Sequence, residues 1–151
     1  LVKLELGEQG TAWIACRHFL QVLKYIKSTQ QGDATKYFED ILHSLVGFEM
    51  YGEAEALCEW LTHNGSEAFA WVYLAGIYGK TGKLEDCAEL CRRGAAKYPE
   101  EKAFFVNETR SLFGLGRIEQ ARQALTGALA KFPDDPVLLK LSLDIPDAVQ
   151  A

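Results

Sequence analysis

The stretch SEAFAWVYLAGIYGKTGKLEDCAELCRRGAAKYPEE, residues 66–101, decides the fold. Its closing segment, Lys97-Tyr98-Pro99, returns thirty-four residues later as Lys131-Phe132-Pro133. Its central segment, Gly82-Lys83-Leu84-Glu85, returns at the same interval as Gly116-Arg117-Ile118-Glu119. Self-similarity at a fixed period of this length is typical of helical repeat arrays, in which each hairpin buries its apolar face against its neighbours. The sequence therefore predicts stacked helical hairpins.

The spacing of apolar and small residues resembles the tetratricopeptide (TPR) repeat family. Residues 68–101 place this pattern on Trp71, Leu74, Tyr78, Gly82, Cys87, Cys91, Gly94 and Pro99. The next copy, residues 102–135, keeps its later positions as Gly116, Ala121, Leu125, Ala128 and Pro133. Its first helix departs from the pattern, because the Trp, Leu, small and Tyr positions hold Phe105, Glu108, Thr109 and Leu112.

An earlier, degenerate copy is found by matching Gly52 to Gly82, which gives a first repeat over residues 38–65. Thr11 can cap a further amino-terminal helix within residues 11–30. Asp135-Pro136 is a cap followed by Pro at the first helical position, which predicts a short terminal helix over residues 136–145. We expect a single all-α domain over residues 1–151, in which these two helices flank three TPR-like hairpins.

Composition limits the classes of function. The net charge of −5 argues against sequence-independent binding to nucleic acid, which needs a dense basic face. No apolar run approaches the roughly 20 residues of a membrane span. The sequence begins at Leu1 without a basic and then apolar leader, so we expect that any targeting segment was removed or never existed. Four cysteines indicate reduced thiols in a cytoplasmic protein rather than a disulfide framework.

The residues that could carry chemistry are better explained by packing. Cys87 and Cys91 lie one helical turn apart, but both occupy core positions of the repeat, where cysteine acts as a small apolar residue. Cys16 and Cys58 have the same interpretation. The three histidines are spread over separate elements without carboxylates at metal-ligand spacing: His18, His43 and His63. No P-loop and no Gly-x-Ser-x-Gly motif occurs, so we expect no metal, no cofactor and no catalysis.

What remains is a surface. In proteins that resemble this one, the first helices of successive repeats line a concave groove. Transferring the groove positions predicts a mostly apolar site for a partner, with one cation, made of Leu42, Val46, Phe69, Val72, Gly76, Val106, Arg110 and Phe113. The alternative is that some of these side chains pack against the terminal helices. Gly76 and Gly79 favour a groove, because a helical Gly costs about 1 kcal/mol against Ala and close approach by another backbone would justify it.

The resemblance also implies which partners to expect. Repeat proteins that clamp acidic tails of heat-shock chaperones use Lys, Asn, Asn, Lys and Arg, where this chain has Leu42, Val46, Tyr73, Ala103 and Asn107. The sequence therefore favours a non-catalytic module that binds an apolar peptide or helix of another protein. The chain also resembles small type III secretion chaperones with three TPRs, in its layout and in residues 51–58. That resemblance implies, as one alternative, a chaperone for a type III translocator or other secretion component. A regulatory domain of a larger enzyme is a second alternative, and homo-oligomerisation stays open.

Overall fold

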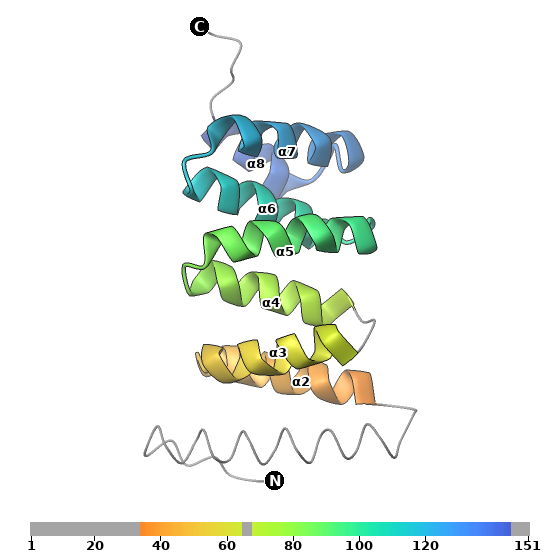
Figure 1. The fold of residues 1–151 in the computed structure, drawn as a ribbon. Coiled ribbons are helices and arrows are strands. Elements are labelled where there is room, and N and C mark those ends of the chain that lie inside the picture. Colours follow the sequence, from red (N-terminus) through yellow and green to blue (C-terminus); the bar gives the residue numbers. More distant parts are fainter. Residues whose placement is uncertain (1–33, 65–67, 146–151) are drawn as a thin grey trace, which may run out of the picture.

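The computed structural model describes residues 34–64 and 68–145, and in these ranges it consists of α-helices stacked in chain order, without a strand (Figure 1). The expected all-α array of helical hairpins is confirmed. The expected helix within residues 11–30 lies outside the described residues, whereas the terminal helix is present as α8. The helices are α2 (Ala34–Gly47), α3 (Tyr51–Asn64), α4 (Ala68–Lys80), α5 (Leu84–Lys97), α6 (Lys102–Gly114), α7 (Ile118–Lys131) and α8 (Pro136–Asp144).

The turns inside the three hairpins share one backbone geometry. Gly82 and Gly116 have φ values of 77° and 73°, in the left-handed region that favours glycine. In the first hairpin Glu49 takes this role, with φ 58°. Each turn is closed by an N–H that reaches the carbonyl five residues earlier, which is the Schellman arrangement of a helix end. These bonds are Met50 N to Leu45 O, Lys83 N to Tyr78 O and Arg117 N to Leu112 O, each 2.9 Å.

The register expected for the first repeat is therefore three residues off. Gly52 lies in the first turn of α3, and the counterpart of Gly82 is Glu49. The error arose because the sequence comparison relied on glycine to mark the turn. A non-glycine residue can adopt this conformation at a cost of about 1–2 kcal/mol when the surrounding helices hold it there.

With the corrected register, equivalent positions of the hairpins are buried alike. Leu42, Ala75 and Thr109 each expose 0% of their surface. The residues where the helices of a hairpin cross are also buried. The first position is small in every hairpin, as the repeat pattern predicts, and holds Ala54, Cys87 and Ala121. The position four residues later holds Cys58, Cys91 and the larger Leu125. Apart from Thr109, these side chains belong to two apolar clusters. One cluster runs from α2 to Phe104 at the start of α6, and the other runs from Ala88 of α5 to Ile145 after α8.

The helices form two layers. In addition to its neighbours in the chain, α4 packs against α2 and α6, and α6 packs against α8. The first helices of successive hairpins thus form a continuous inner layer, while α3, α5 and α7 make the outer layer. In the described ranges, no helix combines the length and the apolar character needed to cross a membrane.

Candidate functional site

The expected groove residues of the second and third hairpins lie on two helices that pack against each other. Phe69, Val72 and Gly76 lie on α4, where Gly76 is exposed and the other two are half-buried. On α6, Arg110 is exposed, Phe113 is half-buried, and Val106 keeps only 8% of its surface exposed. Their spacings of three, four and seven residues place them on one side of each helix.

The expected groove residues of the first hairpin are affected by the register shift. Leu42 is completely buried in the first core cluster and is equivalent to the buried Ala75 and Thr109. Its side chain is therefore unavailable to a partner in this structure. Val46 is half-buried and packs against the same cluster.

In the corrected register, the part of the expected groove on α2 is more polar than the part on α4. Glu39 and His43, both exposed on α2, are the counterparts of Val72 and Gly76 on α4. The inner layer is therefore polar on α2 and more apolar on α4. The sequence held the signal for this difference, but only the position of the Glu49 turn reveals it.

Two positions on the exposed surface of α4 have no side chain because they are glycines. Gly76 and Gly79 are exposed, and a Cβ atom added at either would meet nothing within 4 Å. Neither glycine is required by a positive φ or by a neighbouring side chain, in contrast to Gly94, where a Cβ would lie 2.7 Å from the Phe104 ring. An incoming backbone can therefore approach α4 closely at these two positions.

The cysteines of the described residues are core residues, as the sequence predicts. Cys58, Cys87 and Cys91 are buried free thiols, and Cys16 lies outside the described residues. The Cys87 thiol donates to the Ala75 carbonyl at 3.2 Å, and its Sγ lies 4.0 Å from that of Cys91. The hydrogen bond with Cys87 and burial raise the pKa of Cys91, and burial raises the pKa of Cys58 to about 12. Because their pKa values are raised, the Cys58 and Cys91 thiols are poor nucleophiles at neutral pH.

Metal-binding geometry does not occur in the part of the chain that the structure describes. No three His, Cys, Asp or Glu side chains come together there in a way that could hold an ion. His43 and His63 are exposed on different helices, and His18 lies outside the described ranges.

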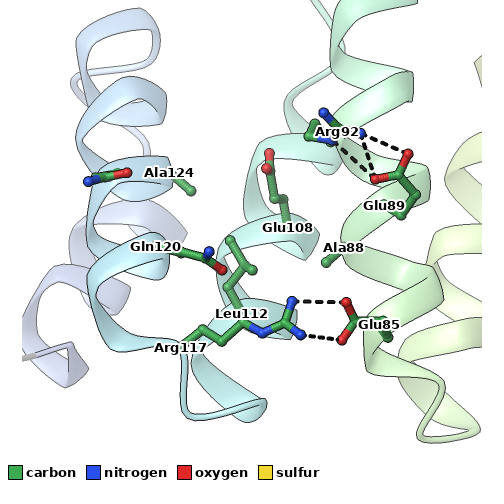
Figure 2. Close-up of a pocket in the computed structure, with 10 residues that line it drawn as sticks. Glu85, Ala88, Glu89, Arg92, Glu108, Leu112, Arg117, Gln120 and Ala124 are labelled. Carbon is green, nitrogen blue, oxygen red and sulfur yellow. Dashed lines mark hydrogen bonds and ion pairs between the residues drawn. The ribbon is translucent and has the colours of Figure 1, made fainter.

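Sequence reasoning did not find a cleft of about 400 Å³ in the outer layer, between α5 and α7 (Figure 2). Glu108 and Leu112 of α6 form its floor, and Ala88 of α5 and Ala124 of α7 form its walls. The sequence signal for this cleft is Glu108, which stands where the repeat pattern has Leu.

The charges around the cleft are unequally partnered. Arg92 binds the Glu89 carboxylate through Nη2 at 2.7 Å, and Arg117 holds Glu85 through two parallel bonds of 2.9 and 2.7 Å. The half-buried Glu108 carboxylate makes no hydrogen bond or ion pair with any described residue. Burial raises the pKa of Glu108, an effect that Arg92 opposes and Glu89 reinforces.

Comparison with known proteins supports the fold. No family model matches the chain, and no curated protein matches its sequence significantly. Among solved structures, the Hsp90 co-chaperone Cns1 from Saccharomyces cerevisiae has a TM-score of 0.67 and 17% identity, over 73% of this chain and 37% of that chain. The first TPR of Spaghetti (RPAP3), bound to an HSP90 peptide, has a TM-score of 0.67 and 14% identity, over 76% of this chain and 92% of its own.

A bacterial structure is similar to the same extent. The Yersinia enterocolitica type III secretion chaperone SycD, in complex with a peptide of the translocator YopD, has a TM-score of 0.65 and 15% identity. The match covers 76% of this chain and 88% of that chain. At these identities the likeness shows the fold alone, and that fold is the TPR helical array.

Proposed function

We propose that this chain is a non-catalytic protein-interaction module that binds an apolar peptide or helix of another protein across α4 and α6. The observation that carries the proposal is the surface of α4, where half-buried Phe69 and Val72 adjoin the exposed Gly76 and Gly79. Exposed glycines in a helix reduce its stability, and a partner backbone lying against them gives a reason for their presence.

The chemistry of this surface suits an apolar segment with a directional polar contact. Covering the exposed parts of Phe69, Val72 and Phe113 would gain about 25 cal/mol for each Å² of apolar area removed from water. Arg110, exposed on α6, makes no ion pair with the described residues and can pair with a carboxylate or a carbonyl of the ligand. Val106 contributes mainly to packing beneath this surface.

An acidic chaperone tail is not the expected ligand. The RPAP3 domain named above is bound to an HSP90 peptide. Proteins that clamp such tails have Lys and Asn at two positions of the first repeat. In the corrected register, this chain has Glu39 and His43 at these two positions. The later positions hold Tyr73, Ala103 and Asn107, which also differ from that pattern. A glutamate at the first of these positions would repel an acidic tail.

The test compares two Gly→Gln variants at exposed helical positions with open space. Gly76→Gln adds a bulky side chain to the proposed surface, whereas Gly127→Gln adds the same side chain to α7, where a Cβ also meets nothing within 4 Å. Peptides selected from a displayed library on the wild-type chain serve as ligands. We expect Gly76→Gln to weaken their binding at least tenfold and Gly127→Gln to leave it unchanged. Equal binding to both variants would exclude α4 as the site.

A secretion chaperone is the second candidate, favoured by the likeness to SycD over most of both chains. Affinity capture followed by mass spectrometry separates the candidates. Capture of one dominant, apolar, secreted protein supports the secretion chaperone, and capture of several cytoplasmic partners supports the protein-interaction module. A catalytic domain found in the same native polypeptide supports a regulatory domain of a larger enzyme. The buried free thiols are compatible with the cytoplasm as the site of action.

A further inference from the structure

The cleft between α5 and α7 exists because the third hairpin departs from its neighbour at two positions. In the second hairpin the equivalent residues are Leu74 and Tyr78. Leu74 is 3% exposed, and Tyr78 reaches across to α3, where its hydroxyl donates to Glu59 at 3.3 Å. In the third hairpin these two places hold Glu108 and Leu112, so a carboxylate replaces an apolar residue and a shorter side chain replaces a bridging aromatic ring.

The walls and the rim hold the cleft open. Ala88 and Ala124 are small, so α5 and α7 contribute little volume to the space above α6. At one end Arg117, just before α7, is tied to Glu85 of α5 by two parallel hydrogen bonds. Such bidentate pairs fix geometry as well as charge. The cleft is therefore a feature of three packed helices rather than of one flexible side chain.

The residues that line the cleft include one more carboxylate than guanidinium groups. The lining contains the acidic residues Glu85, Glu89 and Glu108 and the basic residues Arg92 and Arg117, which leaves one net negative charge. Both guanidinium groups are already held by carboxylates of the rim. The remaining charge belongs to Glu108, whose side chain extends from α6 into the space between α5 and α7 (Figure 2).

We propose that this cleft binds the cationic head and aliphatic stem of a lysine or arginine side chain presented by a partner polypeptide. Leu112, Ala88 and Ala124 offer apolar surface to a stem of three or four methylene groups. Glu108 accepts hydrogen bonds from the ammonium or guanidinium group, in a partly desolvated place where a charged pair is stronger than at an open surface. The amide of Gln120 provides a further acceptor at the wall.

This site is distinct from the apolar surface of the proposed function. Glu108 and Arg110 are two residues apart on α6, which places their side chains about 160° apart around the helix. One belongs to the outer-layer cleft and the other to the surface shared with α4. A partner that uses both surfaces would have to wrap around the edge of the array, but each site can also be occupied alone.

The test uses defined probes and NMR spectra of the full chain. Nα-acetyl-lysine amide is titrated beside its uncharged analogue, Nα-acetyl-norleucine amide, while the amide and methyl signals of Ala88, Leu112 and Ala124 are followed. We expect saturable shifts with the lysine probe and shifts at least tenfold weaker with norleucine. Equal responses to the two probes, or no response to lysine at millimolar concentration, would overturn the proposal.

Variants separate the roles of charge and shape. Glu108→Gln keeps the shape and removes the charge, so we expect lysine binding to fall at least tenfold. Leu112→Tyr keeps the carboxylate but restores the residue that fills the neighbouring hairpin, so binding should also be lost. Glu100→Gln, at a side chain that is 87% exposed outside the cleft, should bind like the wild type. Unchanged lysine binding in Glu108→Gln would overturn the assignment of the carboxylate.

A last comparison identifies the source of the cation. A short peptide of glycine and alanine with one central lysine is compared with butylammonium. Tenfold tighter binding of the peptide supports a polypeptide partner, and equal affinities would overturn it. Because Gly76→Gln leaves the cleft intact, this variant should bind the lysine probe normally. The proposal for the cleft and the proposal for the surface of α4 can therefore be refuted separately.

Discussion

At the scale of single residues, Trp71 is the largest side chain in the second hairpin. It is 7% exposed, and its ring lies edge-on to Tyr98 at 6.2 Å between centroids. The Lys97 ammonium and the Arg93 guanidinium lie over the indole at 5.2 and 5.5 Å. The indole Nε1 is buried without a hydrogen-bond partner among the described residues, so packing rather than polar contact holds the ring.

We predict that Trp71→Ala lowers the free energy of unfolding by about 3–5 kcal/mol, the range for emptying a large aromatic site. Trp71→Phe should cost less, since it keeps an aromatic ring and removes an N–H that has no partner. Urea denaturation followed by circular dichroism measures both. A loss below about 1 kcal/mol for Trp71→Ala would contradict the burial of this ring.

Glu108 is the residue at which stability and binding are expected to conflict. Its pKa is raised in the fold, so folding favours the protonated carboxyl, and the ionised form weakens the fold at neutral pH. We predict that Glu108→Leu raises the free energy of unfolding by about 1 kcal/mol at pH 7, a modest value because the side chain stays partly exposed.

The pH dependence of that gain follows from the sign of the pKa shift. The wild type recovers stability as the pH falls through the raised pKa of Glu108, so the advantage of Glu108→Leu should shrink toward pH 4.5, the ordinary value of the group. Thermal melts at several pH values measure this. An advantage that grew at acid pH would contradict the assigned direction.

At the scale of elements, glycines have opposite roles in α4 and α5. Gly94 of α5 lets the Phe104 ring of α6 approach, and an added Cβ would lie 2.7 Å from that ring. Gly79 of α4 faces open space. We predict that Gly94→Ala costs about 1–3 kcal/mol through overpacking. Gly79→Ala should gain about 0.5–1 kcal/mol because alanine favours the helix. Equal effects in denaturant melts would contradict this difference.

The last helix depends on its amino-terminal cap. Asp135 accepts hydrogen bonds from the backbone N–H groups of Val137 and Leu138, both at 3.0 Å, and pairs with Lys102 of α6 at 2.5 Å. The hydrogen bond with Lys102, followed by those from the backbone, lowers the pKa of Asp135. Its carboxylate therefore anchors α8, whose Leu138 and Leu141 close the second core cluster.

We predict that Asp135→Ala lowers the melting temperature at neutral pH. A lowered pKa contributes stability that is present above the ordinary value of 3.8 and is lost as the pH falls through the value in the fold. The difference between Asp135→Ala and the wild type should therefore shrink below pH 3.8 in thermal melts. A difference that persisted undiminished after protonation would show that the charge does not hold α8.

At the scale of the whole molecule, each hairpin is stabilised mainly by its neighbours, as in other repeat arrays. Cys58, Cys87 and Cys91 lie in the first core cluster, which α2 to α5 build with Phe104. Their thiols can become accessible only when helices of that cluster separate. Thiol reactivity therefore reports the opening of the amino-terminal part of the described array.

We predict that these three thiols react slowly with a disulfide reagent in the native state and rapidly in denaturant, and that the protein contains no bound zinc. The variant Cys16→Ser removes the fourth cysteine, so that only the buried thiols are counted. Absorbance measures the reaction, and metal analysis tests for zinc. Rapid native-state reaction or stoichiometric zinc would contradict the assignment of these cysteines to the core.

The local features of this fold could be predicted from the sequence because they depend on short-range physics. Gly82 and Gly116 mark turns that need positive φ, and the apolar spacing of residues 84–97 requires a neighbouring helix to cover it. The burial of Cys87 and Cys91 followed from their positions in the repeat. The likeness to solved TPR structures agrees with this local pattern.

Two features were decided only by the tertiary structure. Packing of α2 against α3 and α4 holds Glu49 in a left-handed conformation that a glutamate in the sequence does not predict. The turn at Glu49 sets the register in which Leu42 lies in the core and not in the expected groove. The cleft above Glu108 depends on side chains from α5, α6 and α7 that are far apart in the sequence. A repeat pattern specifies each helix by its own period, but the space left between three helices depends on the volumes that all of them contribute.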